Sequence, residues 1–169
     1  MRKLFYWIGA VLLIVALAQC KSPQLIDNES SINEDAFFND PFGFEVNDMA
    51  QFREQFPKAK ETYVIKRNQH YPEKADTIYK FSKGNSEVFY YSSFSGKSFL
   101  LAANIKDQAF PLQNNVQPGM TRALLCHYIK GLPCTGESPY TKKARSAEFK
   151  LFFNEKSKLE RIFFQFYPD

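Results

Sequence analysis

The sequence has few of the features that mark an enzyme or a nucleic-acid-binding protein. Its 169 residues include only two histidines and three cysteines. No glycine-rich phosphate loop, paired-carboxylate motif or run of metal ligands occurs in it. Basic and acidic residues alternate along most of the chain, so no stripe of like charge would neutralise phosphates. We therefore expect no cofactor, no metal and no nucleic-acid partner.

No apolar run is long enough to span a membrane. The longest run extends from Leu4 to Ala18, whereas a transmembrane helix needs about 20 apolar residues. It follows Met1-Arg2-Lys3, and a positive start before a short apolar run is typical of a secretory signal peptide. The sequence therefore predicts export.

The end of this run is more specific. Leu17-Ala18-Gln19-Cys20 resembles the lipobox that bacterial signal peptidase II cleaves, although Gln19 stands where that pattern usually has Gly, Ala or Ser. The resemblance implies removal of residues 1–19 and acylation of Cys20, where two or more chains such as palmitate anchor stably. Lys21 rather than Asp then suggests, by likeness to Gram-negative lipoproteins, the outer membrane facing the periplasm. The alternative is an ordinary signal peptide with an incidental cysteine.

We expect residues 20–42 to form the lipidated cysteine and a flexible tether. Most of this segment is rich in Ser, Asn, Asp and Glu, which bury too little apolar surface to offset the entropy of ordering. Residues 43–169 then predict a single α+β domain, with an antiparallel sheet and short helices on one face.

Local signals divide that domain into elements. Asp48, with Gln51 three residues later, predicts the start of a short helix that Pro57 ends. Thr121 predicts the start of a second helix, which runs to Lys130 and stops at Gly131. Its expected apolar stripe is Met120, Leu124, Leu125 and Tyr128. Runs of β-branched and aromatic residues predict strands at 62–67, 76–82, 87–94, 98–105, 147–153 and 158–167.

The two parts of the domain share a pattern. Residues 87–107 and 148–169 show the same order of features: an acidic residue, an aromatic strand, a polar turn, a second strand and a final Asp. We expect a tandem repeat of a helix plus a meander, over 43–107 and 114–169. The 18 Phe and 9 Tyr are expected to lie mostly in the core; the alternative is an exposed aromatic surface for a partner or glycan.

The cysteines and histidines give no clear catalytic constellation. Cys126 and Cys134 are expected to form a disulfide in an oxidising compartment, worth about 2.5 kcal/mol for so short a loop. Metal binding is the alternative, but these thiols with His127 fall short of four zinc ligands. Cys126 and His127 are neighbours on a helix and point about 100° apart, so they cannot form a nucleophile and base pair. His70 is expected to be an exposed loop histidine.

The second half resembles a known family. Gly119-Met120-Thr121, Leu125, Ile129 and Gly131-Leu132-Pro133 are similar to the helix signature of the β-lactamase inhibitor protein fold. The same signature occurs in the small lipoprotein subunit of the outer-membrane β-barrel assembly machinery, and 158–162 resembles its closing strand. This resemblance implies an α+β layer and protein binding rather than catalysis. Leu124 stands where the family often has Glu, and no binding residue of the family can be matched here.

The favoured hypothesis is a lipid-anchored, non-enzymatic binding or scaffold protein. Its partners are the membrane, through the lipid, and another envelope protein docked on the sheet face or an aromatic loop. One alternative is an inhibitor of a periplasmic or host hydrolase that uses the concave sheet surface. The other is an envelope enzyme with a deep pocket and no recognisable motif.

Overall fold

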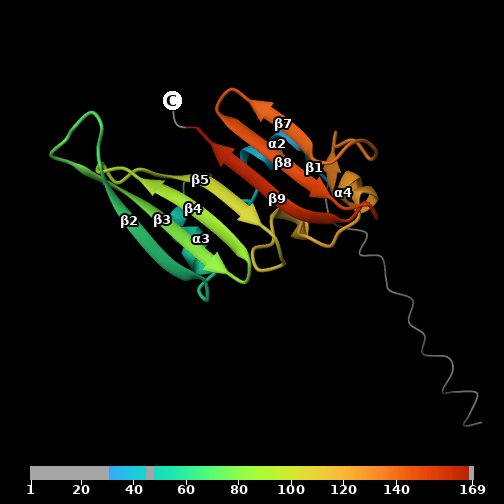
Figure 1. Cartoon of the computed structure of the whole chain (residues 1–169), viewed down its shortest axis with the longest axis horizontal. Helices are drawn as coiled ribbons and strands as arrows, with labels where there is room; N and C mark the ends of the chain where they lie inside the picture. Colours follow the sequence, from blue (N-terminus) through green and yellow to red (C-terminus); the bar gives the residue numbers. More distant parts are fainter. Residues whose placement is uncertain (1–30, 45–47, 168–169) are drawn as a thin grey trace, which may run out of the picture.

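The computed structural model of the protein describes residues 31–44 and 48–167 (Figure 1). Cys20, the apolar run before it and the first part of the expected tether lie outside these residues. In the described part, an antiparallel sheet of seven strands carries short helices on one face, which confirms the α+β class. None of the described helices is long and apolar enough to cross a membrane.

Two meanders meet to form the sheet, whose strand order is β2-β3-β4-β5-β9-β8-β7. β5 and β9 are paired antiparallel at the junction, with Ala103 opposite Phe164. The bounds are β2 (Lys60–Arg67), β3 (Ala75–Lys83), β4 (Ser86–Ser92), β5 (Ser98–Ile105), β7 (Tyr140–Ala144), β8 (Ala147–Phe153) and β9 (Leu159–Phe166). The six strands expected from the sequence are confirmed to within two residues. β7 was not expected, because its Lys-rich sequence lacks the apolar alternation of a strand.

Two helices begin where their capping residues predict. These are α3 (Met49–Gln55) and α4 (Arg122–Tyr128). The Asp48 carboxylate accepts hydrogen bonds from the first turn of α3, and the Thr121 hydroxyl accepts one from the first turn of α4. A short 3₁₀ turn, η1 (Gln113–Asn115), lies in the connection between the two meanders.

The expectation of a flexible tether up to residue 42 is wrong for the described residues. β1 (Ile32–Asn33) pairs with β6 (Ile129–Lys130), and α2 (Glu34–Asn39) follows it. Phe37 is completely buried, and its ring lies 5.8 Å from that of Phe149. The polar residues of α2 do not prevent folding, because burial of its Phe pair offsets the cost of ordering the helix. The folded body therefore begins before residue 43.

The expected end and apolar stripe of the second helix also need correction. α4 ends at Tyr128 rather than Lys130, because the next two residues form β6 against β1. Leu125 is buried as expected, but Leu124 is 41% exposed. Arg122 is buried instead, with its guanidinium 4.0 Å from the centre of the Phe153 ring and Nη2 donating to the Glu137 carbonyl. Gly131 has a positive φ of +100°, but it follows β6 and therefore does not end the helix as expected.

Most described aromatic rings that face the helices are buried, as expected. They form one core between the sheet and the helices, with Phe52 of α3 in contact with rings from two strands and the loops. The buried aromatic residues are Phe37, Phe38, Phe42, Phe52, Phe56, Phe81, Tyr90, Phe110, Phe149, Phe153 and Phe164.

Candidate functional site

One face of the sheet carries no described helix, and we call it the helix-free face. In Figure 1, α2 and α3 lie behind the sheet, and this face is turned toward the viewer. Successive side chains of a strand point to opposite faces. Phe81 and Val88 are paired and buried against the helices, so the neighbouring pair, Lys80 and Phe89, lies on the helix-free face.

Five aromatic rings lie on the helix-free face. Every one of them remains partly exposed, whereas the rings on the opposite face are mostly buried. Tyr91 and Phe99 lie opposite each other on adjacent strands, with ring centroids 4.9 Å apart. The five rings are Phe89, Tyr91, Phe99, Phe152 and Phe163, and they come from β4, β5, β8 and β9.

Cations lie among these rings. The Arg161 guanidinium is 5.0 Å from the centre of the Phe152 ring and 5.7 Å from that of Phe163. Its Nε donates a hydrogen bond of 2.6 Å to the Asn104 side chain, which fixes its position between the two rings. Lys150 also approaches the Phe163 ring, with Nζ 6.0 Å from its centre. The face therefore combines apolar area with positive charge.

Two carboxylates balance part of this charge. Glu87 pairs with Lys80 at 2.5 Å, and Glu148 pairs with Lys150 at 3.0 Å. The hydrogen bond from Lys150, together with the nearby Lys143, holds the pKa of Glu148 below its usual value. Arg161 instead uses the neutral Asn104 as its partner, so its charge is available to a ligand with acidic groups.

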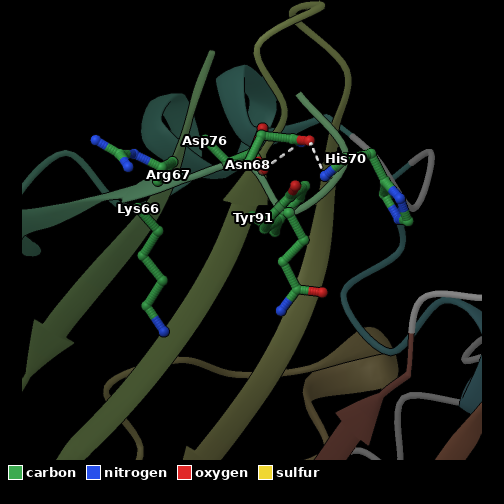
Figure 2. Close-up of a pocket in the computed structure, with 7 residues that line it drawn as sticks. Lys66, Arg67, Asn68, His70, Asp76 and Tyr91 are labelled. Atoms are coloured by element: carbon green, nitrogen blue, oxygen red, sulfur yellow. Dashed lines mark hydrogen bonds between the residues drawn. The ribbon is translucent and has the colours of Figure 1, made fainter. Parts of the chain in front are cut away.

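A hollow of about 550 Å³ opens at the β2 end of the helix-free face (Figure 2). It is lined by residues 66–70 together with Asp76 and Tyr91. Figure 2 shows Lys66 and His70 extending away from Asp76 on opposite sides. His70 is exposed in the loop, as expected.

The Asp76 carboxylate in this hollow is fully engaged in hydrogen bonds. It accepts from the Tyr91 hydroxyl, from the Phe94 backbone at 3.0 Å and from Asn68 Nδ2 at 2.8 Å. These bonds, that of Tyr91 first, lower the pKa of Asp76. Burial, with the bond to Asp76, raises the pKa of Tyr91 to about 12. Through its bonds to Asn68 and Phe94, the Asp76 carboxylate joins the β2–β3 loop to the β4–β5 turn.

Cys126 and Cys134 come together, as the expected disulfide requires. Both are free thiols in the structure, and burial together with a hydrogen bond between them raises the pKa of Cys126 to about 12. A thiol with so high a pKa is a poor nucleophile. His127 is exposed on α4, with its ring against Tyr128. The disulfide stays a prediction.

Among the residues that the structure describes, no group of three or more His, Cys, Asp or Glu is placed to hold a metal ion. The chain matches no protein-family model, and no curated protein and no solved structure is significantly similar to it. The resemblance to the β-lactamase inhibitor protein fold therefore stays a prediction.

The residues of the helix-free face were not identified from the sequence. Their signal is the alternation of ring and buried residue within single strands, such as Phe89 and Tyr91 around the buried Tyr90. In sequence alone the rings of the two faces look alike, because only the position of the helices decides which face is covered.

Proposed function

We propose that the protein is a lipid-anchored envelope protein that binds another envelope protein, without catalysis, through its helix-free face. The observation that carries this proposal is the set of five partly exposed rings on that face, with Arg161 and Lys150 beside the Phe163 ring. Aromatic residues and arginine are the types most enriched at the centres of protein interfaces. A partner would remove the exposed parts of these rings from water and supply acidic groups to the cations.

The anchor is the second part of the proposal. The sequence around Cys20 supports cleavage after Gln19 and acylation of the thiol and the freed amine, on the outer membrane facing the periplasm. Mass spectrometry of the mature protein should find an amino-terminal cysteine with acyl chains. An unmodified Cys20 or a retained leader would contradict this part.

The tandem repeat belongs to the same proposal. The strand orders β3-β4-β5 and β7-β8-β9 mirror each other about the β5–β9 junction, and a short capped helix precedes each meander. This arrangement supports a duplicated unit that cannot bury its apolar face alone. β2 is then an addition to the first unit.

We propose that the protein is not an enzyme because of the chemistry of its most enclosed carboxylate on this face. The most enclosed carboxylate on the helix-free face, Asp76, is held by three donors and has a lowered pKa. A general base needs a carboxylate that is free to accept a proton near neutral pH. The hollow above it therefore suits binding rather than acid–base chemistry.

The test is recovery of the partner from solubilised membranes with the tagged, lipidated protein. Phe163→Ala should weaken binding by about fivefold or more and lower recovery accordingly, because truncation of a central interface ring typically costs over 1 kcal/mol. Leu124→Ala is the matched control, since Leu124 is an exposed apolar residue on α4, away from the face. The proposal fails if no stoichiometric protein is recovered or if both variants behave alike. A captured hydrolase that loses activity would favour the inhibitor alternative.

A further inference from the structure

Among the described residues, no strand pairs with the outer edge of the sheet at β2. β2 is an end strand, and Figure 1 shows no other element beyond it. All eight of its residues are exposed, including three apolar residues at its centre: Tyr63 at 63%, Val64 at 59% and Ile65 at 62%. Long edge strands with apolar centres are rare in monomers, because their free backbone groups pair with other chains.

The opposite edge is protected. β7 is shorter and carries Lys142 and Lys143. Lys142 is held by two carboxylates of α2, through Nζ to Glu34 at 2.9 Å and to Asp35 at 2.5 Å. Charged side chains and a neighbouring element are the usual means by which proteins block an edge. Of the two sheet edges in the described structure, β2 alone lacks this protection at its centre.

We propose that β2 pairs antiparallel with β2 of a second copy of the chain, which joins two sheets into one. A symmetric antiparallel pair places the two-fold axis perpendicular to the sheet. Side chains that lie opposite each other then point to the same face only if the axis lies midway between the two copies of one residue. With the axis at Val64, that residue faces the partner's Val64, and Tyr63 faces the partner's Ile65. The apolar centre of each strand then covers that of the other.

The charges at the strand ends favour this register and this partner. With the axis at Val64, Lys66 lies opposite the partner's Thr62, so no two like charges meet. Glu61, which two hydrogen bonds join to Arg53 of its own chain, lies opposite the partner's Arg67. Opposite charges directly across a pair are stabilising, and like charges are destabilising. Moving the axis to Tyr63 would set Lys60 opposite the partner's Lys66, and moving it to Ile65 would set Val64 opposite the partner's Lys66. The strand is therefore complementary to itself in one register.

The dimer has a consequence for binding, which rests on the proposed function. A two-fold axis perpendicular to the sheet leaves both helix-free faces on the same side. Two lipid-anchored copies would thus present one doubled surface, and a partner with two matching sites would bind with higher avidity.

The first test is the mass of the full chain, as processed in its host, in a non-denaturing detergent. At about 10 µM, where a dimer with a micromolar Kd is populated, the wild type should have twice the mass of one chain. Val64→Lys should raise the dimer dissociation constant by about tenfold or more, because it sets two like charges opposite each other. Thr141→Lys adds the same charge to β7 and should leave the mass unchanged. A monomeric wild type, or a Val64→Lys protein that remains dimeric, would overturn the proposal.

The second test is specific for the register and does not depend on the stability of a charge variant. In a background with Cys126 and Cys134 replaced by Ser, Val64→Cys should form an oxidised dimer, since directly paired Cα atoms lie about 4.5–5.5 Å apart. Thr62→Cys should not, because its two copies would be offset by four residues, about 13 Å. Equal cross-linking of both variants, or of neither, would refute this register. Cross-linking of Val64→Cys to a different polypeptide would show that another chain occupies β2.

Discussion

Truncation of Phe37 tests whether the segment before residue 43 belongs to the folded core. Phe37 is completely buried on α2, with its ring centroid 5.7 Å from that of Phe38 and 5.8 Å from that of Phe149. A buried Phe→Ala substitution costs about 3–5 kcal/mol, from lost transfer free energy and the cavity left behind. Because a domain of this size is stable by only about 5–15 kcal/mol, Phe37→Ala removes a large share of the total.

Urea unfolding followed by circular dichroism measures this loss. With an m value of about 2 kcal/mol/M, the midpoint should fall by about 1.5–2.5 M. Leu124→Ala is the control, since Leu124 is 41% exposed on another short helix and its loss should change stability by about 0.5 kcal/mol or less. If Phe37→Ala unfolds within about 0.5 kcal/mol of the wild type, α2 does not contribute to the core.

Three further predictions follow from the cap, an ion pair and the cysteines. Thr121→Ala should lower the free energy of unfolding by about 1 kcal/mol through loss of the α4 cap, and no loss would show that the cap is not formed. Two hydrogen bonds from Arg53 lower the pKa of Glu61 from its usual 4.5. Because the pair is exposed, it should add less than about 1 kcal/mol to the free energy of unfolding. This stabilisation is present above pH 4.5 and is lost as the pH falls through the lower pKa of the folded state. Glu61→Gln should therefore be less stable than the wild type at pH 7 and equal to it in acid, and a difference that persists at pH 2 would contradict this. Protein isolated from an oxidising compartment should contain the Cys126–Cys134 disulfide, and its reduction should lower the free energy of unfolding by about 2.5 kcal/mol. If both thiols can be alkylated without prior reduction, this prediction is wrong.

Elements with local signals could be predicted from the sequence, and elements set by distant contacts could not. The cap at Asp48 acts within a few residues, so the first helix was located correctly. β1 and β6 have two residues each and exist only because they pair across the chain. α2 has six residues, too few for a stable isolated helix, and it forms through the burial of Phe37.

The candidate site followed the same division. Cys20, Cys126 and Cys134 were singled out because cysteines are rare in this chain and their chemistry is distinctive, and the lipid and the disulfide stay predictions. The rings of the helix-free face could not be separated from core rings, since Phe163 and Phe164 are neighbours that differ only in the face they occupy. The burial of Arg122 was missed because its contact with Phe153 joins positions far apart in the sequence.

We propose that the helix-free face binds another protein while the lipid holds the chain at the membrane. A photo-cross-linking amino acid placed at position 163 of the lipidated protein probes this contact in intact cells and without purification. We expect one discrete adduct of higher mass, absent when the same amino acid is placed at position 124 on α4. No adduct at position 163, or the same products at both positions, would contradict it.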